Sequence, residues 1–256
     1  MLLFDPIARR AGGQRAVAAA SFAATAVAAL LLACSAGAAA QPVEWQGELA
    51  LASELTDRGL VVGPRRALLQ GQLSAYLGSQ WSASLAASAQ REGLRYSRVL
   101  ARLGRNWTLS NDWQLDTGLS YYAYPGDSSQ RRYDRFEAAA VAGYRDVLSL
   151  GLTALHYAER SHGLPWAADL GLRWPLAGVV SGLGAPAEAW SLTASVGRAT
   201  LLQATAFHYS YGSLGLAWQQ GAWRAEVNRL AADGKAGAWV GRPQPARWAA
   251  VLARNF

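Results

Sequence analysis

The chain has 256 residues, a formal net charge of +7, 52% hydrophobic residues and a single cysteine, Cys34. One cysteine excludes an intramolecular disulfide and a thiolate metal site, and the length suits one domain. The arginines are scattered along the chain instead of forming a basic stripe, which argues against nucleic-acid binding despite the positive charge.

Residues 1–40 have the pattern of a secretory signal peptide. Three arginines precede an apolar run at 17–33, and small residues (Ala38 to Ala40) form a cleavage site before Gln41. Two alternatives stay open: a membrane-spanning anchor helix, and lipidation of Cys34, because "LLAC" at 31–34 resembles a lipobox. Residues 41–256 keep a net charge of +5, since the leader holds three arginines and one aspartate.

The mature chain alternates between apolar and polar residues with the period of two that indicates β-strands. Twelve strands are predicted, at 43–57, 65–77, 80–91, 97–108, 112–124, 132–144, 147–159, 166–174, 188–199, 206–219, 222–232 and 246–256. Prolines fall between these segments or at their ends, where a missing N–H costs no ladder hydrogen bond. The alternation predicts an all-β fold.

Short connections alternate with long ones along this series. "GS" at 78–79, "RD" at 145–146 and "QG" at 220–221 are tight turns, whereas "RGLVVGPR" at 58–65 and "PGDSSQR" at 125–131 are longer loops. This alternation is typical of a membrane-spanning antiparallel up-and-down β-barrel with its short turns in the periplasm. The connection at 175–187 is long where a short turn is expected. No constriction loop is apparent.

Aromatic residues concentrate at the predicted strand ends. Eight of the eleven tryptophans fall at the periplasmic ends and form a predicted girdle: Trp45, Trp81, Trp107, Trp113, Trp174, Trp190, Trp218 and Trp223. Tyrosines fall at the opposite ends and predict a second, outer girdle: Tyr96, Tyr121, Tyr122, Tyr124, Tyr133, Tyr157, Tyr209 and Tyr211. Two aromatic belts are expected where a barrel meets the two membrane interfaces.

The polar face of the strands is predicted to line the barrel lumen. Its candidate residues are Glu48, Glu54, Arg58, Arg66, Gln70, Gln72, Arg98, Arg102, Asp116, Arg135, Glu137, Asp169, Arg173, Arg224 and Glu226. Two interpretations stay open. Either these residues line a narrow porin-like channel for hydrophilic solutes, or their ion pairs lock across the lumen and leave a structural barrel.

An enzymatic alternative rests on "FHYSYG" at 207–212. His208 and Ser210 share one face of a strand and resemble the H-x-S-N-G motif of outer-membrane phospholipase A, a calcium-dependent lipid hydrolase. Tyr211 stands where that motif has asparagine, so the resemblance ends at two residues. We therefore expect no enzyme; a lipid hydrolase of the phospholipase or lipid A deacylase type is the alternative. No metal-ligand spacing occurs and no cofactor is expected.

The chain also resembles the Gcw_chp-type family of proteobacterial outer-membrane barrels, which has no established function. The likeness lies in "LALASELTDRGLVVGPRRALLQG" at 49–71 and "LDTGLSYYAYPG" at 115–126. It implies the outer membrane of a Gram-negative bacterium, with lipid and lipopolysaccharide as surroundings. Phe256, at the end of the last strand, resembles the signal that such barrels present to their assembly machinery.

Overall fold

The computed structural model describes residues 43–62, 64–90, 93–126, 131–158, 165–176, 190–202, 206–233 and 247–256. The predicted signal peptide and Cys34 lie outside this part of the chain. Within it, no helix combines the length and the apolar composition that a membrane crossing requires.

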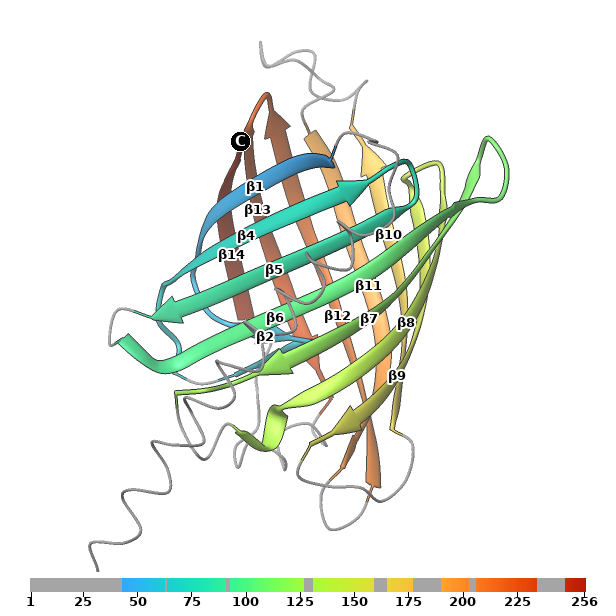
Figure 1. Ribbon diagram of the computed structural model, residues 1–256. Helices are drawn as coiled ribbons and strands as arrows, with labels where there is room; N and C mark the ends of the chain where they lie inside the picture. Colours follow the sequence, from blue (N-terminus) through green and yellow to red (C-terminus); the bar gives the residue numbers. More distant parts are fainter. Residues whose placement is uncertain are drawn as a thin grey trace, which may run out of the picture. The chain divides into compact units, whose positions relative to one another are not determined.

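Twelve of the described strands form a closed antiparallel barrel in which each strand pairs with its neighbours in sequence (Figure 1). The barrel strands are β1 (Val43–Ala52), β4 (Leu68–Leu77), β5 (Trp81–Gln90), β6 (Gly93–Thr108), β7 (Trp113–Ala123), β8 (Arg135–Tyr144), β9 (Leu148–Tyr157), β10 (Trp166–Pro175), β11 (Trp190–Leu202), β12 (Ala206–Gln220), β13 (Trp223–Ala232) and β14 (Arg247–Asn255). A 3-10 turn, η1 (Arg131–Tyr133), precedes β8. The predicted twelve-stranded all-β barrel is confirmed.

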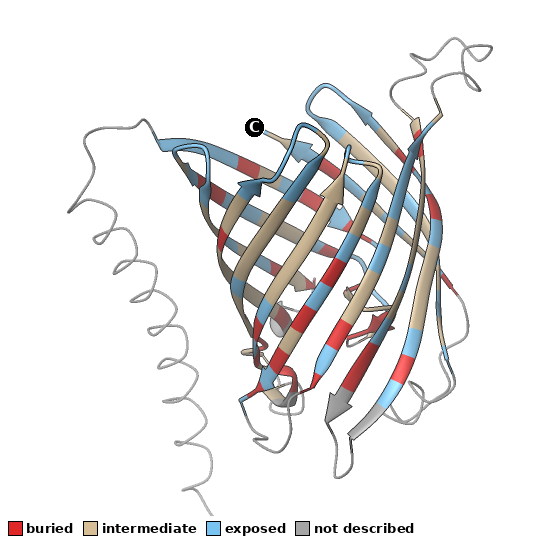
Figure 2. Ribbon diagram, turned by 90° about the vertical axis from the view of Figure 1, so that its right-hand side faces the viewer, coloured by how far each residue is buried: buried red, intermediate tan, exposed pale blue. Residues whose placement is uncertain are grey.

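The two faces of the strands differ in the way that the alternation predicts. Leu119 and Leu152 point outward, with exposed fractions of 62% and 59%, whereas Ala50 and Ala217 point inward and are buried. Buried residues gather toward the end of the barrel opposite the C-terminus (Figure 2). An outward apolar band around a closed barrel is the surface that lipid covers.

We call the end of the barrel where β1 begins and β14 ends the terminus end, and the opposite end the loop end. All eight girdle tryptophans lie within three residues of a strand end at the terminus end. Six of them, including Trp45 and Trp174, are more than a third exposed.

Phe256 closes the seam between the first and last strands. Its backbone amide and carbonyl exchange hydrogen bonds with Gly47, with N–O distances of 3.0 and 2.9 Å. The ring lies over Gly47, where a Cβ atom would stand 2.2 Å from a ring carbon. Only glycine leaves room for the ring at this position.

Two strand boundaries differ from the prediction by four residues or more. β1 ends at Ala52 instead of residue 57, because the chain there turns out of the barrel wall. β6 begins at Gly93 instead of residue 97, so this strand extends four residues further toward the loop end than predicted. The unusual connection at 175–187 lies almost entirely outside the described residues.

Candidate functional site

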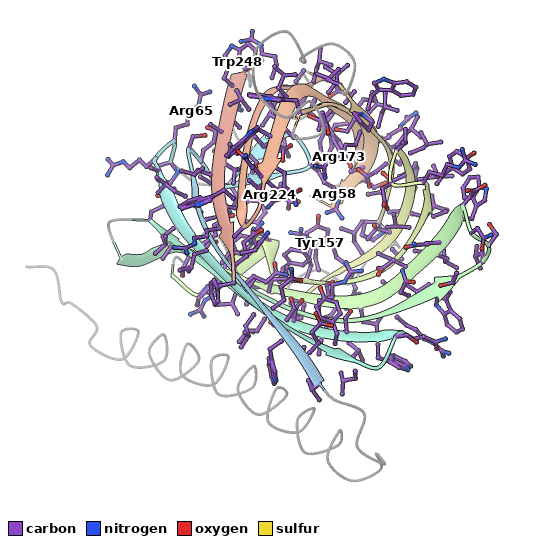
Figure 3. The ribbon with its side chains drawn as sticks, turned by 90° about the horizontal axis from the view of Figure 1, so that it is seen from above. Arg58, Arg65, Tyr157, Arg173, Arg224 and Trp248 are labelled. Atoms are coloured by element: carbon purple, nitrogen blue, oxygen red, sulfur yellow. The ribbon has the colours of Figure 1, made fainter. Side chains whose placement is uncertain are left out.

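The connection between β1 and β4 folds into the barrel. Two hydrogen bonds hold Ser53 to β14 at the point where the chain leaves the wall. The amide of Ser53 donates to the carbonyl of Ala250 (2.9 Å), and its hydroxyl accepts from the amide of Ala250 (3.0 Å). The chain then forms β2 (Thr56–Asp57) and β3 (Leu60–Val61), which pair only with each other. Looking down the barrel, Figure 3 shows Arg58 inside the lumen. We call residues 53–62 the lumen segment; the predicted absence of a constriction loop is wrong.

Arg58 and Gly59 form the tight turn between β2 and β3. Their φ angles are +45° and +75°, and positive values at both central residues are the mark of a type I′ hairpin turn. Gly59 is also required by space, because a Cβ atom there would lie 2.7 Å from the Cβ of Tyr211 on β12. Arginine rarely adopts a positive φ, so other contacts must hold Arg58 in place.

Those contacts come from a group of four charged side chains, which we call the charge cluster. Both terminal nitrogens of Arg58 donate to the two carboxylate oxygens of Glu137, each at 2.9 Å. The guanidinium of Arg135 lies 2.8 Å from the carboxylate of Asp57 and 2.5 Å from that of Glu137. Arg135 and Glu137 are only 2% and 6% exposed. The cluster therefore joins the lumen segment to β8 by buried, charge-assisted hydrogen bonds.

The electrostatics of the cluster favour its ionised form. Burial alone would raise the pKa of Asp57, but the charges of Arg135 and Arg58 outweigh this effect and hold it below its ordinary value. Burial lowers the pKa of Arg58, but the carboxylates of Asp57 and Glu137 outweigh burial and raise this pKa above its ordinary value. Two arginines and two carboxylates thus neutralise one another, and all four side chains are largely buried.

Tyrosines and apolar side chains surround the lumen segment. Leu55, Leu60 and Val62 are at most 2% exposed and pack in one cluster with Tyr124, Tyr133, Tyr157 and Tyr209. The hydroxyl of Tyr209 donates to the carbonyl of Arg58 (3.2 Å). Burial raises the pKa of Tyr124 to about 12, so this phenol stays protonated at neutral pH. For these four tyrosines the predicted outer girdle is wrong, because they fill the lumen.

Little free space separates the lumen segment from the described wall residues around it. The cavity between it and the wall measures about 10 Å³ and is lined by Asp57, Arg58, Arg135, Tyr157 and Tyr209, among others. That volume is near the minimum for one water molecule. The lumen segment therefore packs closely against the described part of the wall at this level.

The lumen is wider toward the terminus end. A cavity of about 690 Å³ opens between β8, β9, β10 and β11, and small inward residues such as Gly143, Ser149, Gly171 and Ser191 line it. A second cavity of about 80 Å³ lies between Glu48, Gln70, Gln72 and Arg98. Arg173 and Arg224 project into the lumen (Figure 3). Between the lumen segment and the terminus end, the barrel thus contains open volume that polar side chains line.

The predicted lumen residues outside the charge cluster pair mainly along the wall. Partners lie on the same strand or on strands one or two places apart, namely Arg102 with Asp116, Arg224 with Glu48 (3.0 Å), Arg173 with Gln219 (3.4 Å), Glu226 with Asn228 (2.6 Å) and Asp169 with Tyr211. Glu54, in the lumen segment, lies 3.7 Å from Arg247. Arg66 is exposed in the connection before β4 and lies on no strand. Contacts across the lumen come from the lumen segment.

His208 and Ser210 lie on the outward face of β12, at the loop end. The Nδ1 atom of His208 shares a hydrogen bond with the hydroxyl of Thr200 (2.9 Å), and the ring packs 5.7 Å from that of Trp166. Within the described residues, no hydrogen bond joins His208 to Ser210. No group of three or more acidic, histidine or cysteine side chains placed to hold a metal ion occurs in the same part of the chain.

Comparisons with known proteins establish the fold. No family model and no curated protein matches the chain, so the family resemblance stays a prediction. The chain is similar to the NanC porin, with a TM-score of 0.50 at 9% identity over 83% of this chain and 99% of that one. It is also similar to the KdgM porin in complex with oligogalacturonate (TM-score 0.48, 8% identity, covering 84% and 99%). OccAB3 of Acinetobacter baumannii gives a TM-score of 0.43 at 8% identity over 85% of this chain, which spans 65% of OccAB3. At these identities the likeness concerns the fold alone, a closed antiparallel β-barrel.

Proposed function

We propose that this protein is an outer-membrane channel for small hydrophilic solutes whose mouth at the loop end is closed by the lumen segment. The observation that carries the proposal is the inward-folded hairpin, held by the charge cluster above an otherwise polar, open lumen. The loop end faces outward, because long connections of such barrels lie on the cell surface.

The distribution of free volume supports a channel over a solid barrel. A barrel built only as a scaffold would be filled with side chains along its whole length. Here glycine and serine line the cavity at the terminus end, and the ion pairs of that region follow the wall. Closure depends on one segment of about ten residues, which continues into the wall strands β1 and β4.

The sign of the lumen charges supports a pathway for polar solutes without a strong preference for either ion charge. Arginines and carboxylates alternate along the wall, as in Arg224 beside Glu48 and Arg102 beside Asp116. Such pairs keep water in the lumen but create no extended field of one sign.

Planar-bilayer conductance tests the proposal. The mature chain from Gln41 is compared with a variant in which residues 54–62 are replaced by a short glycine-serine linker. The wild type should be silent or open briefly, and the variant should give long-lived steps with little dependence on voltage. Arg102→Ala serves as the matched control, because it removes a wall ion pair without contact with the lumen segment.

Each arm has a defined reading once folding is confirmed by the heat-dependent gel shift of barrels. Long-lived steps in the linker variant alone support a closed channel. Silence of both proteins contradicts the proposal and leaves a structural barrel. Equal steps in wild type and linker variant would also contradict it, because the lumen segment would then not close the pathway.

A further inference from the structure

The outward face of the barrel carries charge of only one sign. Among the outward side chains that the structure describes on the barrel strands, none is aspartate or glutamate. Four are arginines, namely Arg105, Arg198, Arg229 and Arg254. Arginine on the lipid face is costly near the membrane centre and tolerated near the interfaces. Each of the four therefore needs a partner or an interfacial position.

Three of these arginines have partners within the protein. Arg105 lies over the ring of Trp107 at 3.7 Å, Arg254 over Trp223 at 5.4 Å, and Arg229 over Trp248 at 5.6 Å. Each of these guanidinium groups therefore has an aromatic ring of the protein as its partner.

Arg198 differs from the other three. It is exposed on β11, and among the described residues no hydrogen bond, ion pair or ring contact involves it. Eight residues separate it from Trp190 in the girdle at the terminus end. With a rise of about 3.3 Å per residue and a tilt of about 40°, that places it about 20 Å above the girdle. The apolar band of such barrels is about 25 Å tall, so the backbone of Arg198 lies just inside its outer edge, and the long arginine side chain can extend to the headgroups of the outer leaflet.

Polar groups surround Arg198 on the same face. Ser210 is its direct partner across β12, and Thr200 pairs with His208 in the next outward row. Diagonal neighbours in such rows are about 7–8 Å apart, within reach of one phosphate group. His208 uses Nδ1 for its bond with Thr200, and both His208 and Ser210 are exposed. Asp233 binds the amide of Ser210 (2.8 Å) and is the acidic group nearest in register.

We propose that Arg198, Ser210 and His208 form a lipid-facing site that holds a phosphate group of an outer-leaflet glycolipid. A guanidinium binds two phosphate oxygens at once, and a hydroxyl and an imidazole can donate to the others. The ring of Trp166, packed on His208, would contact the sugar or acyl part beside the phosphate. The site is independent of the lumen, so it stands whether or not the barrel conducts.

The test measures binding of fluorescent, doubly phosphorylated lipid A to the folded chain in detergent. Arg198→Ala should weaken binding about tenfold, the loss expected for one charge-assisted bidentate contact. Arg254→Ala is the matched control, an outward arginine at the terminus end, and should change the dissociation constant less than twofold. The heat-dependent gel shift confirms that both variants are folded.

Two further probes separate the sources of affinity. Lipid A without its phosphates should bind wild type and Arg198→Ala equally, since only the acyl and sugar contacts remain. Equal binding of phosphorylated lipid A to wild type and Arg198→Ala would overturn the proposal, as would an equal loss in Arg254→Ala, which would indicate unspecific attraction. Complete displacement of the lipid by an equal concentration of inorganic phosphate would also overturn it, because the site would then take the free ion.

Discussion

Replacing Glu137 with alanine should release the lumen segment from the wall. Glu137 accepts two hydrogen bonds from Arg58 and one from Arg135, and all three side chains are largely buried. Removing one partner of a buried ion pair costs about 3–5 kcal/mol, because the remaining charge stays buried without compensation. Asp57 still neutralises part of this charge, so we expect the lower end of that range. At about 1.4 kcal/mol per factor of ten, the undocked population should rise about a hundredfold.

A buried cysteine can report this population. Val62 is 2% exposed, and residues 41–256 contain no cysteine, so Val62→Cys introduces a single thiol that reacts only when the segment undocks. When docking and undocking are fast, the labelling rate follows the undocked fraction. Adding Glu137→Ala to this background should therefore accelerate labelling about a hundredfold.

Asp116→Ala provides the control for general loss of charge. Its pair with Arg102 is more than a third exposed on both sides, and exposed pairs contribute only about 0–1 kcal/mol. Labelling of Val62→Cys should then rise less than about fivefold. The reasoning would be refuted if Glu137→Ala stayed within the same limit, because the charge cluster would then not hold the segment.

Three further predictions use simple measurements. Gly59→Ala should increase labelling of Val62→Cys about tenfold or more, because alanine is strained at φ +75° and its Cβ meets Tyr211 on β12; an unchanged rate would contradict the turn geometry. Burial raises the pKa of Asp57, but its arginine neighbours outweigh burial and hold the pKa below its ordinary value, so the contribution of Asp57 to docking is complete at neutral pH and is lost as pH falls below roughly 4. Labelling should be flat from about pH 8 to 5 and faster below pH 4, with a smaller acid effect in Asp57→Asn. Phe256→Ala should lower the yield of folded barrel in cells by a larger fraction than it lowers thermal stability, because the ring is 72% exposed. Equal fractional losses of yield and of thermal stability would argue against a role of Phe256 in assembly.

The barrel could be predicted because its signal is repeated. Each strand contributes the same alternation, so an error at one boundary leaves the count and the two faces unchanged. Leu119 on the outer face and Asp116 on the inner face of β7 are both placed by this rule. Strand ends are predicted less accurately, as β6 shows. A strand can extend past the apolar band into polar residues that resemble a loop.

The closed loop end could not be predicted by the same rule. A tyrosine near a strand end fits a headgroup belt and a packed lumen equally well, and only a partner inside the barrel decides between them. For Tyr157 and Tyr209 that partner is the lumen segment. One signal was present: Leu60, Val61 and Val62 form an apolar run within a connection that was expected to meet water. Such a run needs a surface to pack against.

The contacts of the lumen segment join residues that are far apart in the chain, and this sets the order of folding. Arg58 binds Glu137 at a separation of 79 residues and Tyr209 at a separation of 151. Loop closure over such distances is slow until the intervening strands are in place. The hairpin is synthesised first, yet it finds its last partner only when β12 has joined the sheet. Docking thus reports a nearly finished barrel, and a chain that stalls before β12 keeps the hairpin accessible to proteases.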